Sequence, residues 1–173
     1  MQFGMRAEDL RTDPGVVYFV KCAKDYVALI ERIMAGEVVT ILEVSKTLAI
    51  LYAAGFGLPD PELPEHDVFP NSFNMTTDDW FKIFGAMGNW FHAELAKLKL
   101  EPAELESTIL SHVDDDLADI YRDLKAELLG WETGNSAYDP EIVFEWKFSF
   151  ETHWGFHAVN TLSVMHDLAW KTR

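Results

Sequence analysis

Two histidines lie four residues apart in one of the most aromatic segments of the chain, residues 148–157. In a helix, His153 and His157 would share one face, because positions i and i+4 point in the same direction. Two imidazoles at this spacing can bind one transition-metal ion. The pair supplies only two ligands, so a metal site needs further side chains from another part of the fold.

Carboxylates that could complete such a site occur in residues 113–129, which have helical periodicity. Asp116 and Asp123 border the apolar stripe of this segment, so they could turn toward a neighbouring helix that carries the histidines. The pattern therefore predicts a cluster of His153, His157, Asp116 and Asp123. Asp119 lies farther from the stripe, and we expect it to be solvated.

Two interpretations of this cluster stay open. It could bind a divalent transition-metal ion, or it could be a buried Asp–His hydrogen-bond network, which is the more common role of such a pair. Catalysis would be an additional property of the metal site. No other cofactor is expected, because the chain contains no glycine-rich phosphate loop, nucleophile elbow or dinucleotide-binding fingerprint.

Helical periodicity organises most of the chain. Asp13 and Asp139, each followed by proline, are start signals in which aspartate caps the helix, and Thr77 resembles a capping residue. No convincing pair of strands is present. The predicted class is all-α, a single-domain bundle of about five helices over residues 1–173. The predicted helices are residues 14–35, 38–54, 77–100, 113–129 and 140–171, and residues 102–111 could add a short one.

The last predicted helix is apolar on most of its sides, which favours a central position in the bundle. Its helical wheel places Asn160 on the stripe that carries the two histidines. Gly155 is expected to kink the helix or to allow the close approach of another.

Residues 55–76 contain four prolines and two glycines, which exclude a long helix. A connection of this length is often a lid or a binding loop. We prefer a strap that packs Phe69, Phe73 and Met75 onto the bundle.

Length and composition are those of a protein with a substantial core: 173 residues, of which 49% are hydrophobic. No apolar run is long enough to span a membrane, and the N-terminus lacks the pattern of a secretory signal. Cys22 is the only cysteine, which excludes an internal disulfide. The expected location is the cytoplasm, and the expected state is a monomer or a homodimer.

The strongly acidic charge narrows the classes of partner. The chain has 14 Lys and Arg against 29 Asp and Glu, a formal net charge of −15. Such a surface repels phosphate backbones, so nucleic-acid binding is not expected, whereas basic partners and cations are attracted. The leading functional hypothesis is a non-enzymatic, acidic protein-binding or regulatory factor whose partner has a basic surface. The alternative is a metal-binding helical protein, with metal-dependent hydrolysis as one option.

Two blocks of sequence, residues 115–125 and 145–158, resemble a bacterial family named domain of unknown function 5063. The segment Leu51-Tyr52-Ala53-Ala54 with Leu58-Pro59 is similar to the second helix of that family. Residues 93–111 depart from its pattern. The resemblance implies a compact helical bacterial protein, and it implies no activity, cofactor or site residue.

Overall fold

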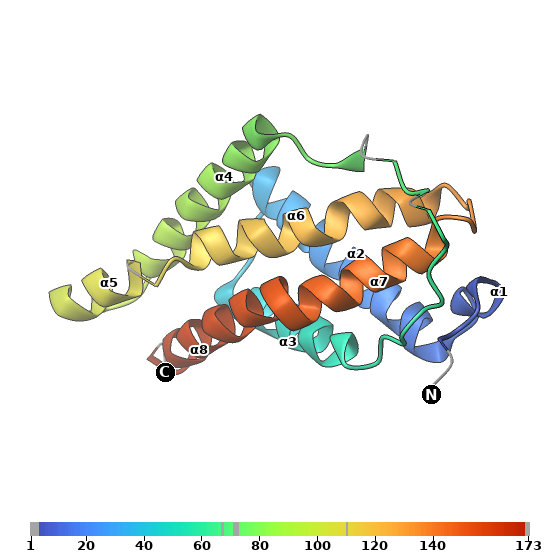
Figure 1. The fold of residues 1–173 in the computed structure, drawn as a ribbon. Coiled ribbons are helices and arrows are strands. Elements are labelled where there is room, and N and C mark those ends of the chain that lie inside the picture. The colour runs from blue at the N-terminus through green and yellow to red at the C-terminus, as the bar shows by residue number, and fades with distance from the viewer. Residues whose placement is uncertain (1–3, 67, 71–72, 110, 172–173) are drawn as a thin grey trace.

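The computed structural model describes residues 4–66, 68–70, 73–109 and 111–171 (Figure 1). Within these ranges the chain is helical and forms no strand beyond one isolated bridge between Met5 and Pro61. The predicted all-α class is confirmed, although the helices outnumber the five expected. They are α1 (Ala7–Leu10), α2 (Pro14–Met34), α3 (Ile41–Gly55), α4 (Thr77–Leu95), α5 (Pro102–Ile109), α6 (Val113–Glu132), α7 (Asp139–Ser149), the π-helix η2 (Phe150–Trp154) and α8 (Gly155–Lys171).

Side-chain caps explain where the long helices begin. The Asp13 carboxylate accepts a hydrogen bond from the backbone N–H of Val16 at 2.9 Å, as the sequence predicted for the start of α2. Thr40 and Glu43 form a reciprocal capping box at the start of α3. In α4 the capping residue is Thr76, one position before the residue predicted.

Helix α6 is the hub of the bundle, since it packs against α2, α4, α7, η2 and α8. Its buried side chains meet a row of apolar residues on α2, and each large apolar side chain contributes about 1.5–3 kcal/mol on burial. A buried polar contact fixes the register of the pair, because the Tyr26 hydroxyl donates to the backbone oxygen of Leu117 at 2.9 Å. The fully buried residues of the two helices include Phe19, Ala23, Tyr26, Ile30, Leu117, Ile120 and Leu124.

The C-terminal run of α7, η2 and α8 packs against α3 and α6 (Figure 1). Trp146 and Trp154 are completely buried within it. One face nevertheless stays exposed, which corrects the expectation that the run is enclosed on most sides. Besides α3 and α6, the start of the run contacts α1, and the Phe19 ring of α2 packs against Trp146 and Trp154. The exposed apolar residues of the other face are Phe144, Phe148, Phe156 and Val159.

Asp139 does not cap α7, contrary to the prediction. The residue before the helix is Tyr138, and the Asp139 carboxylate is buried in a two-point ion pair with the Arg11 guanidinium, both N–O distances being 2.6 Å. A buried carboxylate requires such a partner. The pair fixes the segment that follows α1 against the start of α7.

The proline-rich connection between α3 and α4 packs on the bundle as predicted. Phe69 and Met75 lie against the core, and Phe73 stacks on Phe69 with ring centroids 5.4 Å apart. The backbone N–H groups of Val68 and Phe69 donate to the Glu141 carboxylate on α7 at 2.6 and 2.9 Å. We call residues 63–74, without the undescribed positions 67, 71 and 72, the strap.

None of the helices described has the length and apolar character that crossing a lipid bilayer requires.

Candidate metal centre

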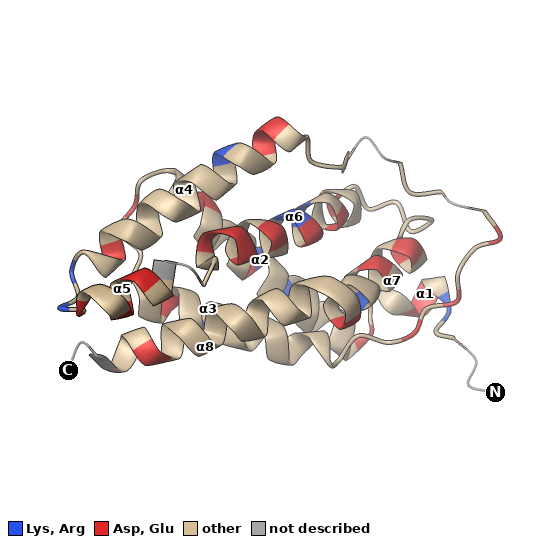
Figure 2. Ribbon diagram, turned by 60° about the vertical axis from the view of Figure 1, so that its left-hand side comes forward, with Lys and Arg blue, Asp and Glu red and all other residues tan. Residues whose placement is uncertain are grey.

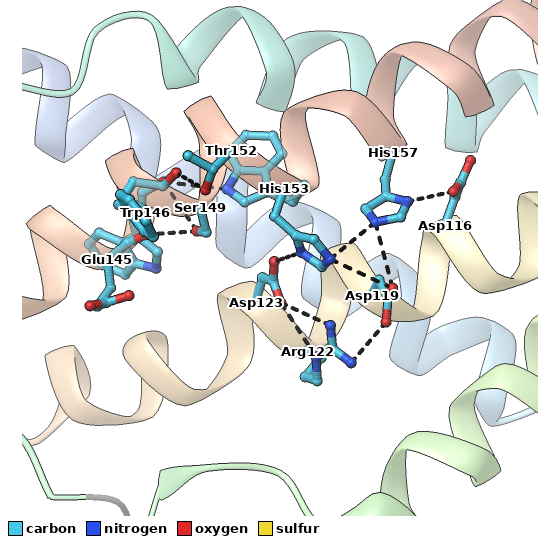
Figure 3. A network of polar contacts seen from close by, with 12 residues as sticks. Asp116, Asp119, Arg122, Asp123, Glu145, Trp146, Ser149, Thr152, His153 and His157 are labelled. Carbon is cyan, nitrogen blue, oxygen red and sulfur yellow. Dashed lines mark hydrogen bonds and ion pairs between the residues drawn. The ribbon is translucent and has the colours of Figure 1, made fainter.

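The acidic side of the candidate site comes from α6. Asp116, Asp119 and Asp123 recur at intervals of three and four residues, which places them along one side of a helix. That side faces η2 and α8, the two elements that carry the histidines. Figure 3 shows the three carboxylates along α6 opposite the two imidazoles.

The histidines lie at a local irregularity of the C-terminal run. His153 belongs to the π-helix η2, and His157 lies in the first turn of α8. Gly155 permits this geometry, because a Cβ atom at its position would lie 2.2 Å from the backbone oxygen of Phe150. Single π-turns of this kind recur at functional sites. The sequence predicted a kink or the close approach of another helix at Gly155; the structure has a π-turn directly before this residue.

Each imidazole has its Nδ1 atom against a carboxylate. Nδ1 of His157 lies 2.5 Å from Oδ1 of Asp116, and Nδ1 of His153 lies 2.5 Å from Oδ2 of Asp123. Because an ionised carboxylate can only accept a hydrogen bond, both Nδ1 atoms donate. A neutral imidazole that donates from Nδ1 has a lone pair on Nε2. When both rings are neutral, each therefore presents an Nε2 lone pair to the space between them.

Three atoms with lone pairs converge in that space. The two Nε2 atoms are 3.3 Å apart, and Oδ2 of Asp119 lies 3.6 Å from Nε2 of His157 and 4.0 Å from Nε2 of His153. The point equidistant from the three atoms of this triangle is about 2.1 Å from each, which is the usual length of a bond from zinc to imidazole nitrogen or carboxylate oxygen.

The other oxygen of Asp119 is held by two donors. Oδ1 accepts a hydrogen bond from the indole N–H of Trp80 on α4 at 2.9 Å and lies 3.0 Å from the Arg122 guanidinium. These contacts orient the carboxylate so that Oδ2 faces the imidazoles (Figure 3). The side chain of Asp119 is only 13% exposed, so the expectation that it is solvated was wrong. Sequence periodicity alone does not reveal a donor from α4.

Asp116 is the most enclosed carboxylate of the group. Its Oδ2 atom accepts a hydrogen bond from the hydroxyl of the buried Thr161 at 3.2 Å. Burial raises the pKa of Asp116, and the hydrogen bond with His157 acts in the opposite direction. The helical wheel predicted that Asn160 faces inward with the histidines, but Asn160 is exposed and Thr161 is the inward residue. The π-turn adds one residue to the turn and moves the inward stripe of α8 by one position.

The structure thus brings all four predicted site residues, His153, His157, Asp116 and Asp123, into one cluster. Asp116 and Asp123 contact the outer nitrogens of the rings, and Asp119, which the sequence interpretation left out, faces the inner ones. The spacing of Asp119, three residues from Asp116 and four from Asp123, could have indicated that it lies on the same side of the helix.

Solvent reaches the centre from the His153 side. The side chain of His153 is 41% exposed and that of His157 is 21% exposed. A cleft of about 260 Å³ adjoins His153, with Arg122, Glu127 and Thr152 among its lining residues. The cleft therefore gives access to the His153 ring from solvent.

Comparisons with known proteins agree with the fold. No curated protein matches the chain. A crystal structure of protein BF1032 from Bacteroides fragilis is similar to it over 92% of this chain and 97% of that chain, with 22% identity and a TM-score of 0.70. At this identity the likeness shows the shared fold alone. Residues 11–171 match the family described as Domain of unknown function (DUF5063), so the chain belongs to that family.

Proposed function

We propose that this protein binds a divalent transition-metal ion through Nε2 of His153, Nε2 of His157 and Oδ2 of Asp119. The observation that carries the proposal is the convergence of three lone pairs on a point about 2.1 Å from each atom. Lone pairs repel one another unless a cation lies between them. Two imidazoles and one carboxylate suit zinc, iron and other first-row ions.

The carboxylates behind the rings support a metal rather than a purely structural network. Ligating histidines commonly donate their second ring N–H to a carboxylate, which fixes the tautomer and increases the basicity of the ligand. Asp116 and Asp123 occupy that position behind His157 and His153. We therefore assign the two residues as supports of the ligands, and this changes the role that the sequence suggested for them.

Three protein ligands leave coordination positions for water or a substrate, as in catalytic zinc sites and unlike closed structural ones. A bound ion of this kind supplies Lewis-acid chemistry and activates water. The partial exposure of His153 and the cleft beside it support access of a substrate from that side. Hydrolysis is the first activity to test once binding has been measured.

The competing explanation is a proton in place of the metal. One ring would then be an imidazolium that donates from Nε2 to the other ring and to Asp119, and the cluster would be a structural network. The two explanations differ in their response to chelators, because a proton-bridged network is indifferent to metal removal.

Calorimetric titration of zinc into chelator-treated protein tests the proposal. We expect one ion per chain, and we expect Asp119→Asn and His157→Ala each to weaken binding at least 10-fold. His166→Ala is the matched control, because His166 is exposed and lies on α8, like His157, but outside the cluster. The zinc affinity of this variant should equal that of the wild type. Unchanged affinity in Asp119→Asn, or no zinc uptake by the wild type, would refute the site.

The acidic charge supports a second candidate function, the binding of a basic protein partner. Figure 2 shows Asp and Glu on most helices and only scattered Lys and Arg, in keeping with the net charge of −15. Such binding should weaken as salt rises, because exposed charges are screened within about 8–10 Å at physiological ionic strength. A pull-down at low and high salt tests it, and salt-independent capture would argue against a charge-driven interface.

A further inference from the structure

Glu127 is the next acid along the side of α6 that carries Asp119 and Asp123, and one of its two carboxyl oxygens has no hydrogen-bond partner. Its Oε2 atom is buried and has no hydrogen-bond partner. Burial, together with the smaller effect of the nearby charges of Asp123 and Glu145, raises the pKa of Glu127 to about 8. A buried, unsatisfied carboxyl oxygen destabilises the folded protein, so its retention calls for an explanation.

The side chain of Glu127 belongs to the lining of a cleft between the strap and the α6–α7 pair, and it also lines the smaller cleft beside His153. The cleft has a volume of about 690 Å³, within the usual range of small-ligand sites. Its polar lining is acidic or neutral, and none of the described lining residues is Lys or Arg. One of its acids, Glu141, is already engaged by the backbone of the strap. The apolar wall consists of Leu63, Pro64, Val68, Phe69, Pro70 and Phe144.

We propose that this cleft binds an aliphatic ammonium group, with Glu127 as the acceptor at its base. An ammonium has three N–H donors and no acceptor, so it pairs with the orphaned oxygen and compensates the acidic lining. Its methylene chain lies along the apolar wall, as lysine stems do on protein surfaces. A free alkylamine and the side chain of a lysine in a peptide share this chemistry.

The charge state of Glu127 gives the binding a characteristic pH dependence. Pairing with an ammonium requires the ionised carboxylate, whereas the free protein holds the proton at neutral pH. Asp123 and Glu145 lie close enough to raise the pKa of Glu127 by their charges, and Glu145 also lines the cleft. Affinity should therefore rise at least 10-fold between pH 6.5 and pH 8.5.

Calorimetric titration of pentylamine at pH 8.5, into chelator-treated protein, tests the proposal. Pentan-1-ol is the control ligand with the same apolar chain and no charge, and the peptide acetyl-Gly-Lys-Gly-amide tests the lysine source. We expect Glu127→Gln to weaken ammonium binding at least 10-fold. Glu132→Gln is the matched control on the same helix, where the carboxylate pairs with Lys24 at the surface, and it should bind like the wild type.

The outcomes separate clearly. Pentylamine binding that depends on Glu127 supports a free amine as the ligand, and binding of the lysine peptide alone supports a side chain of a partner. Equal affinity for pentylamine and pentan-1-ol, equal affinity in Glu127→Gln and wild type, or no binding of either amine would overturn the proposal. None of these results depends on whether zinc binds at His153, His157 and Asp119.

Discussion

Replacement of Glu127 by glutamine should stabilise the protein, and the gain should grow with pH. In the native state burial raises the pKa of this carboxyl to about 8, whereas an ordinary glutamate titrates near 4.5. The native state therefore retains a proton that the unfolded chain releases. The stability this provides is complete below pH 4.5 and is lost as the pH rises toward 8. Glutamine has the same shape and does not titrate.

The size of the effect follows from the interval between the two pKa values. One pKa unit corresponds to about 1.4 kcal/mol, so the interval from 4.5 to about 8 gives an upper limit of about 5 kcal/mol at high pH. Water that reaches Glu127 through the cleft reduces this value. We expect the difference in unfolding free energy between Glu127→Gln and wild type to increase by about 2–3 kcal/mol from pH 5.5 to pH 8.5.

Urea denaturation at several pH values measures this difference, in a range above the isoelectric point of about 4.6, where the protein carries net charge. Glu132→Gln, which removes an exposed carboxylate, should differ from wild type by an amount that changes little over the same range. A difference for Glu127→Gln that is constant with pH, or that shrinks as the pH rises, would refute the assignment of a buried, protonated carboxyl.

Three further substitutions test the fold and the site. Gly155→Ala forces a Cβ atom against a backbone oxygen, so we expect the free energy of unfolding to fall by about 1–3 kcal/mol and zinc binding to weaken. Gly85→Ala is the control: a Cβ atom there meets open space, so the change should be neutral or stabilising by up to about 1 kcal/mol. Melting curves and zinc titrations of both variants measure these effects. Arg11→Ala leaves the buried Asp139 carboxylate unpaired and should cost about 2–4 kcal/mol in urea denaturation. His157→Ala should cost about 1–3 kcal/mol through its orphaned carboxylate, and an unchanged melting temperature would contradict the buried contact.

The sequence predicted the start of a helix correctly where a single capping residue determines it. Asp13 caps α2 because proline follows it and an N–H lies within reach of its carboxylate. The identical signal at Asp139 failed, because a distant guanidinium on Arg11 competes for the same carboxylate. A partner 128 positions away in the chain leaves no trace in local periodicity. An N-terminal helix cap can be predicted from the local sequence only when the capping side chain is not engaged in an ion pair with a distant residue.

The candidate site was predictable as a meeting of two helices and unpredictable in its detail. The i, i+4 spacing of His153 and His157 indicated a shared face, and the acids of the preceding helix were the natural partners. The π-turn, however, changes which residues follow the histidines inward, so Thr161 replaced Asn160. A wheel drawn at a constant angle cannot include an inserted residue. For the same reason it could not show which acid faces the Nε2 atoms.

The stripe of acids along α6 argues for a cation more strongly than any single contact. Asp116, Asp119, Asp123 and Glu127 follow one another at intervals of three and four residues, where like charges repel. Asp116 and Asp123 hold the two imidazoles so that their Nε2 atoms face Oδ2 of Asp119, and with neutral rings all three facing atoms carry lone pairs. Glu127 has a buried oxygen with no partner. A network selected only for stability would neutralise these atoms internally, whereas sites for cations leave them open.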